Sequence, residues 1–177
     1  MRDLGDRKFP RRMYFNGKSY GVDNMFIESQ GFTLMMPTFP TDRKQALYDE
    51  MKQRIYKGEK LGAREQQEPE LAGAEWEYGS RENGGFWYSM NGPIILGTAT
   101  FDKSEARRLL KQMSLANHAR QFPQYWSSYW SAADNIESSL VPGEGLPDQT
   151  GIYPDIAIAC AHLHAWMLYC YNRLNEQ

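Results

Sequence analysis

The segment Arg81-Glu82-Asn83-Gly84-Gly85 gathers the side chains of this sequence best suited to holding a ligand. Two adjacent glycines allow a sharp backbone turn and let a ligand approach the main chain closely. A guanidinium and a carboxylate directly before the glycines would flank that opening, one donating hydrogen bonds and the other accepting them. The segment fits equally a loop with a solvated ion pair, and these residues alone leave both interpretations open.

A second group of polar side chains begins at Asp134, shortly after an aromatic stretch at 124–130. Aromatic residues make up 14% of the chain. Such rings either fill a core or line a groove in which they stack on sugar faces. Polar groups beside them either cap helices or bind sugar hydroxyls, and the residues alone do not choose between the two.

Two histidines, His162 and His164, lie close together in a stretch that predicts a helix. Residues two apart on a helix point about 200° away from each other, so this pair cannot chelate one metal ion. The sequence also contains no phosphate-binding glycine loop of the nucleotide-binding types and no nucleophile elbow. We therefore expect no metal ion and no resident cofactor.

The composition excludes several classes of partner. The chain has 177 residues, of which 41% are hydrophobic, and we expect one globular domain over 1–177. A formal net charge of -2 gives no electrostatic footprint for nucleic acid or an anionic membrane surface. No apolar run approaches the roughly 18 residues that a membrane-spanning helix requires. Residues 1–12 also lack the apolar core of a signal peptide.

The two cysteines, Cys160 and Cys170, are ten residues apart in the last predicted helix. That spacing separates them by about 15 Å along a helix, which is too far for a disulfide. Free thiols are typical of a reducing compartment, so we expect a cytoplasmic protein.

The remaining pattern predicts helices and one short hairpin. Alternation around Asn16-Gly17 predicts a β-hairpin over 13–20. Asp102 with Glu105 forms a capping box that opens an amphipathic helix. Glycine, glutamate and glutamine over 58–80 predict a long loop, and Pro93 should kink or restart its helix. Hydrophobic periodicity predicts six helices, over 23–36, 41–57, 86–98, 102–113, 124–137 and 156–174.

Four segments, in this order, resemble the inverting glycoside phosphorylases, the cellobiose phosphorylase family and its relatives that act on β-glucans. They are Phe26-Ile27-Glu28-Ser29-Gln30-Gly31-Phe32, Arg81-Glu82-Asn83-Gly84-Gly85, Leu115-Ala116-Asn117-His118-Ala119-Arg120 and His164-Ala165-Trp166. The similarity runs from about residue 13 to 174.

This resemblance implies a fold and a reaction. It implies an all-α chain that forms about half of an (α/α)6 barrel, as three helical hairpins from the C-terminal portion of the catalytic domain. The substrate would be a β-linked gluco-oligosaccharide, cleaved by inorganic phosphate as co-substrate to give α-glucose 1-phosphate. A partner polypeptide or a second copy would cover the open side of the half-barrel, because an uncovered apolar face aggregates.

The resemblance also implies roles for individual residues. Arg81 and Glu82 would contact the sugar beside the cleavage point, and Gln30, Trp87 and Asp134 would complete the substrate-binding set. Ser89 stands where cellobiose phosphorylase has a phosphate-binding histidine, and His162 would supply the donor that Ser89 lacks. These departures suggest a β-1,2 or β-1,3 linkage.

No residue of this chain matches the family's general-acid aspartate, so the resemblance assigns no catalytic residue. Two other functions remain open. One is a non-catalytic oligosaccharide-binding or assembly module. The other is a related hydrolase or transferase that uses water or a sugar hydroxyl as the acceptor.

Overall fold

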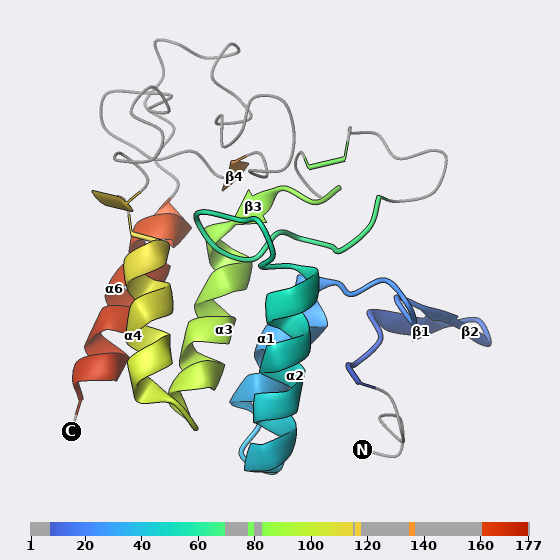
Figure 1. The fold of residues 1–177 in the computed structure, drawn as a ribbon, viewed down its shortest axis with the longest axis horizontal. Helices are drawn as coiled ribbons and strands as arrows, with labels where there is room; N and C mark the ends of the chain where they lie inside the picture. The colour runs from blue at the N-terminus through green and yellow to red at the C-terminus, as the bar shows by residue number, and fades with distance from the viewer. Residues whose placement is uncertain are drawn as a thin grey trace, which may run out of the picture.

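A computed structural model describes residues 8–69, 78–79, 83–114, 116–117, 135–136 and 161–176. Within these ranges, Figure 1 shows helices standing side by side, with short strands at one end and a hairpin at one side. The strands are β1 (Met13–Phe15), β2 (Lys18–Tyr20), β3 (Phe86–Trp87) and β4 (Asn135–Ile136). The helices are α1 (Ile27–Met35), α2 (Thr41–Arg54), α3 (Tyr88–Ala99), α4 (Lys103–Gln112) and α6 (Ala161–Asn175).

The hairpin predicted from Asn16-Gly17 is present. β1 pairs antiparallel with β2, and Met13 lies opposite Tyr20. Asn16 and Gly17 have φ values of 48° and 76°, which is the backbone conformation that a two-residue hairpin turn requires.

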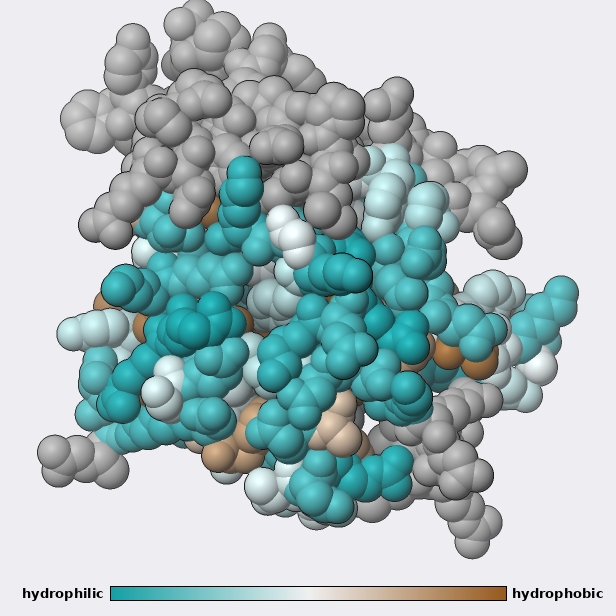
Figure 2. Space-filling model, in the orientation of Figure 1, coloured by the Kyte–Doolittle hydropathy of each residue, from teal (hydrophilic) through white to brown (hydrophobic). Residues whose placement is uncertain are grey.

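The helix boundaries follow local chemistry. α1 stops before Pro37, and α2 begins directly after Pro40. α4 begins at its predicted cap, where Asp102 Oδ1 accepts a hydrogen bond from the Glu105 amide at 2.9 Å. Its apolar face packs into the core through Ala106, Leu109 and Met113. Figure 2 shows that the face over α2 and α4 is mostly hydrophilic, as expected for amphipathic helices on the outside of a core.

In chain order, α1 to α4 alternate in direction, so that α1 and α3 are parallel neighbours. Side by side on α1 and α3, Gly31 lies against Pro93, and Leu34 lies against Gly97, so these two helices run parallel. Lys44 near the start of α2 binds Thr100 after the end of α3, so α2 runs in the opposite sense. In α4, Lys103 contacts Glu176 and Gln112 contacts Glu59, which gives α4 the direction of α2.

α6 runs in the same direction as α3. The Trp166 ring lies against Gly92, and Cys170 Sγ lies 3.6 Å from the Gly92 carbonyl oxygen. Further along, Tyr169 and Arg173 share a cavity wall with Leu96 and Thr100. α1, α3 and α6 therefore begin at one end of the molecule, the end that carries β3 and β4 (Figure 1).

The expectation of an all-α half-barrel is wrong. Short antiparallel strands and bridges connect segments that were expected to be loops or helix ends. Residues 86–87 form a strand rather than the first turn of a helix, and residues 135–136 are a strand within a predicted helix. The aromatic pair Phe86-Trp87 favours extended backbone, and its peptide groups find partners on both sides.

The packing of α3 also argues against a barrel. Its buried residues, from Asn91 through Thr98, point in every direction around the helix. α1 packs along α3, and so do α4 and α6. A helix that lines the inside of a barrel keeps one face toward the cavity, whereas α3 is the packed centre of the described helices.

α3 continues through Pro93 without a break. Proline has no N–H, so the Ser89 carbonyl loses the hydrogen bond that residue 93 would have donated in a regular helix. The ring packs in compensation, because the Pro93 Cβ lies 2.9 Å from where a Cβ on Gly31 would be.

No helix in the described part of the chain is long and apolar enough to cross a membrane. The Cys170 thiol is buried and free, and burial raises its pKa to about 12. Cys160 lies outside the described residues.

Candidate functional site

Gln30 is held in α1 by its own helix and by the N-terminal segment. Its side chain is fully buried, and Nε2 donates to the Phe26 carbonyl at 2.7 Å and to the Pro10 carbonyl at 3.1 Å. No donor in the described part of the chain reaches its Oε1. Gln30 therefore ties the start of α1 to Pro10 and has one buried oxygen, Oε1, that no described donor reaches.

Trp87 and Ser89 lie where β3 turns into α3. Trp87 is the last residue of β3 and Ser89 is the second residue of α3, and both side chains are half-buried. The Trp87 carbonyl accepts a hydrogen bond from Asn91 Nδ2 at 2.9 Å, which fixes the first turn of the helix. Ser89 thus lies in the first turn of α3, near the positive end of the helix dipole.

His162 occupies the second position of α6. Trp166, one turn later, lies against Gly92, and Ser89 precedes Gly92 by about one turn. Because α3 and α6 run parallel, the backbones at 89 and 162 lie at similar heights on neighbouring helices. Arg81, Glu82, Asp134 and the side chain of His162 lie outside the described residues.

A narrow antiparallel ribbon crosses the end of the molecule where α1, α3 and α6 begin. It consists of four segments, 25–27, 64–67, 85–87 and 135–136, and we call it the crossing ribbon. Phe26 pairs with Gln66, Arg64 pairs with Phe86, and Phe86 pairs with Ile136. Ladder hydrogen bonds join Ile27 N to Glu65 O and Glu65 N to Gly85 O, each at 2.8 Å.

The 64–67 segment is therefore the link between two predicted site segments. On one side it pairs with the residues that lead into α1 and Gln30. On the other side it pairs with Gly85, the last residue of the Arg81–Gly85 segment, and with Phe86, which precedes Ser89 by three residues. From the sequence, residues 64–67 were expected to lie within the long loop over 58–80. Only the unusual length of that loop indicated that it has a function.

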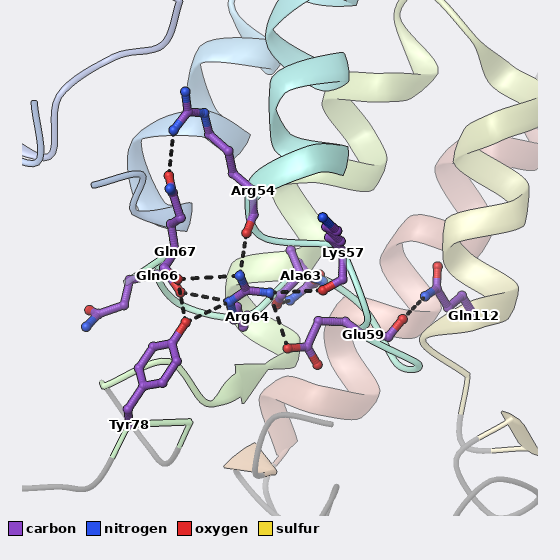
Figure 3. Close-up of polar contacts among 10 residues, drawn as sticks. Arg54, Lys57, Glu59, Ala63, Arg64, Gln66, Gln67, Tyr78 and Gln112 are labelled. Carbon is purple, nitrogen blue, oxygen red and sulfur yellow. Dashed lines mark hydrogen bonds and ion pairs between the residues drawn. The ribbon is translucent and has the colours of Figure 1, made fainter. Parts of the chain in front are cut away.

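Arg64 holds residues 64–67 against the end of α2 and the turn that follows it. Its guanidinium donates to the carbonyl oxygens of Arg54, Lys57 and Gln66 at 2.5, 3.3 and 3.1 Å (Figure 3). It also forms an ion pair with Glu59, with Nη1 and Oε1 3.6 Å apart. These interactions connect the end of α2, the turn after it and the crossing ribbon.

Tyr78 joins the same network from the far side of the loop. Arg64 Nε donates to its hydroxyl at 3.1 Å, and that hydroxyl donates to the Gln67 carbonyl (Figure 3). Burial raises the pKa of Tyr78, so its hydroxyl keeps the proton that it donates. The Gly79 amide then donates to the Asn83 carbonyl at 2.6 Å.

Gly84 has a structural reason to be glycine. Its φ is +99°, and a Cβ there would lie 2.9 Å from the Tyr78 ring. The side of Gly84 that a ligand could have approached is therefore filled by Tyr78.

Within the predicted site segment Arg81–Gly85, the part that the structure describes contains one polar side chain, that of Asn83. Its side chain is buried, and Oδ1 accepts a hydrogen bond from Gln66 Nε2 at 2.7 Å. Gln66 is itself fully buried, and no described donor reaches its Oε1. Sequence reasoning missed Gln66, because a glutamine in a polar loop gives no signal of burial.

Two surface cavities flank α6 in the described part of the chain. One, of about 370 Å³, lies between α4 and α6 and is lined by Leu110, Met167 and Tyr171 among others. The other, of about 310 Å³, lies among α1, α3 and α6 near Met35 and Thr100. Gln30, Trp87 and Ser89 line neither cavity; they lie in the first turns of α1 and α3 and at the end of β3, next to the crossing ribbon.

No family model matches this chain. None of the curated proteins matches it either.

Proposed function

We propose that this chain is the sugar- and phosphate-binding part of an enzyme that phosphorolyses β-glucosidic bonds to α-glucose 1-phosphate. The proposal starts from the four sequence segments that, taken in their order along the chain, resemble inverting glycoside phosphorylases. One structural observation carries it further: α1, α3 and α6, the helices that bear Gln30, Ser89 and His162, begin at the same end of the molecule.

Three helices that begin at the same end of the molecule favour the binding of a phosphate ion there. The start of a helix carries amide N–H groups without intrahelical partners and the positive end of a helix dipole. Anions bind at helix N-termini for these two reasons together. In α1 the first of these amides, Ile27 N, donates to Glu65 O at 2.8 Å. Ser89 adds a hydroxyl donor at the start of α3, and His162 occupies the equivalent turn of α6.

The sugar would lie beside the phosphate, against Trp87, Arg81 and Glu82, because Tyr78 fills the open side of Gly84. An aromatic ring at the edge of the site offers a stacking face, and Arg81 with Glu82 offers a donor and an acceptor for hydroxyls. The general acid would come from a complementing polypeptide, because no residue of this chain matches it. We further propose that the protein is cytoplasmic, in keeping with the buried free thiol of Cys170.

The test uses the full chain first alone and then with a complementing polypeptide. Alone, it should bind phosphate and at least one of sophorose, laminaribiose and cellobiose, measured by calorimetry. Expressed together with a complementing polypeptide that carries the general acid, it should release glucose 1-phosphate only when phosphate is present. Release of free glucose without phosphate would favour a hydrolase instead. Binding without any turnover in a well-folded complex would favour a non-catalytic sugar-binding module.

A further inference from the structure

We infer that the groove between α4 and α6 is a docking site for an acidic amphipathic helix of another polypeptide. The groove is the cavity of about 370 Å³ between these helices, and its lining residues take no part in the proposed sugar and phosphate site. The inference therefore goes beyond the proposed function and does not depend on it.

Two stripes of side chains form the walls of this groove, and each stripe follows the three- and four-residue spacing that places side chains on one face of a helix. The α4 wall includes Arg107, Leu110 and Lys111. The α6 wall includes Met167, Tyr171 and Leu174. The two helices lie side by side and run in opposite directions (Figure 1), so the groove follows both of them and a third helix can pack along it.

The apolar surface of α6 continues beyond the cavity. Tyr171 is 59% exposed, and Leu168, one turn earlier on the same face, is 61% exposed. Large apolar side chains grouped on a surface in this way mark interaction sites. An occupant that covers the cavity and this extension has to run along α6, as a helix does when it lays apolar residues from successive turns into a groove.

The cations on the α4 wall determine the charge of the occupant. Arg107 and Lys111 are exposed and lie one turn apart, and neither pairs with a carboxylate within the described ranges. The Arg107 guanidinium donates to the Leu174 carbonyl oxygen at 3.1 Å, which holds it at the groove. Glu105, the carboxylate of α4, pairs with Arg108 instead. Carboxylates one turn apart on a docked helix would complement Arg107 and Lys111.

A second copy of this chain would not supply those carboxylates. In a symmetric dimer formed through this groove, each copy presents the same two walls. Glu176, the carboxylate after the end of α6, already pairs with Arg173. Such a dimer would bring the cations of both copies to one interface without acidic partners, so the occupant is a different polypeptide.

Two synthetic peptides are the probes, and both are added to the full chain. Each is about 15 residues long, enough to form a helix on binding, and presents leucines on one helical face. They differ only in carrying glutamates or lysines along the flank of that face. Fluorescence anisotropy measures both affinities, and we expect the glutamate peptide to bind at least about ten-fold more tightly than the lysine peptide.

Reversing the charge of the α4 wall should reverse this preference. In the double variant Arg107→Glu, Lys111→Glu, the glutamate peptide should bind about ten-fold more weakly and the lysine peptide more tightly. Lys111→Glu alone keeps the Arg107–Leu174 hydrogen bond and should shift both affinities in the same directions by less. The matched control is Lys18→Glu, Lys57→Glu, which changes the net charge equally at exposed positions outside the groove and should leave both affinities unchanged.

Tyr171→Ser tests the apolar wall. Because this side chain is largely exposed, the variant should keep its melting temperature, while both peptides bind about ten-fold more weakly.

Equal affinities of the unmodified chain for the two peptides would overturn the inference, and so would binding of neither. An equal loss in the Lys18→Glu, Lys57→Glu control would also overturn it, because the attraction would then come from the overall charge. Sedimentation of the unmodified chain covers the remaining occupant: a dimer that Tyr171→Ser dissociates would assign the groove to a second copy instead.

Discussion

Arg64 and Glu59 form an ion pair below the protein surface, with side chains that are only 8% and 3% exposed. Glu59 lies in the turn after α2, and Arg64 lies in the crossing ribbon. The pair thus fastens the ribbon to the helices beneath it, and the same guanidinium donates to four carbonyl groups.

Arg64→Ala should be among the most destabilising single substitutions in the described part of the chain. It leaves the Glu59 carboxylate buried beside carbonyl oxygens that have lost their donor. Breaking a buried pair in this way costs roughly 3–5 kcal/mol of unfolding free energy. Urea denaturation would measure the loss. Arg173→Ala is the control, because its pair with Glu176 is exposed, and it should cost less than about 1 kcal/mol. Equal losses in the two variants would contradict the prediction.

Gly97→Ala should destabilise the protein, although helix propensity alone predicts a gain of roughly 1 kcal/mol. A Cβ at Gly97 would lie 2.3 Å from Leu34 Cβ and 2.9 Å from the Leu34 carbonyl carbon. These atoms cannot swing away, so α1 and α3 would have to separate, which costs about 1–3 kcal/mol. Thermal unfolding gives the sign directly, with Ser104→Ala on the exposed start of α4 as a near-neutral reference. A raised melting temperature in Gly97→Ala would show that the two helices are not in close contact.

Tyr48→Phe should destabilise the protein more at neutral pH than at acid pH. The Tyr48 hydroxyl donates to Glu105 Oε1 at 2.7 Å. Hydrogen bonds from Arg108 first, and then from Tyr48, lower the pKa of Glu105. A carboxyl with a lowered folded-state pKa contributes stability above its ordinary pKa, and this contribution disappears as the pH falls through the folded-state value.

The expected loss for Tyr48→Phe is therefore roughly 1 kcal/mol at pH 7 and smaller at pH 3. Urea unfolding at the two pH values measures the difference. Tyr14→Phe, at an exposed position on β1, should change stability at neither pH. A loss that grows as the pH falls would contradict the assignment of Glu105 as the charged acceptor.

Elements with strong local signals were predictable from the sequence. Asn16-Gly17 specifies a hairpin turn by its preference for positive φ, and Asp102 with Glu105 specifies the start of α4. Both signals act within a few residues, so they survive without knowledge of the rest of the fold. α2 and α4 were also found from apolar residues that recur on one face.

The crossing ribbon could not be predicted, because its pairings are not local in sequence. Each of its segments is two to four residues long, and Phe26 finds its partner Gln66 forty residues away. Alternation over so few residues cannot be distinguished from a loop. Arg64 and Gln66 lie in a run of charged and amide residues that is typical of solvated chain, and only the tertiary contacts bury them. The all-α expectation failed at these residues, and Gln66 was missed for the same reason.

Substitutions of Ser89 distinguish a specific phosphate site from the general attraction of anions to the N-termini of helices. Ser89 and Ser104 are both the second residues of their helices, α3 and α4, but these helices begin at opposite ends of the molecule. Under the proposed function, Ser89→Ala should weaken phosphate binding by about ten-fold, the effect of losing one hydrogen bond to a charged group. Ser104→Ala should leave it unchanged. Ser89→His should strengthen binding below the pKa of the new imidazole, because its protonated ring adds a positive charge, and this gain should vanish as the pH rises. Phosphate titrations followed by calorimetry at pH 6 and pH 8 would decide. Equal effects of the two alanine substitutions would mean that any exposed helix start suffices, and the assignment of Ser89 would then be wrong.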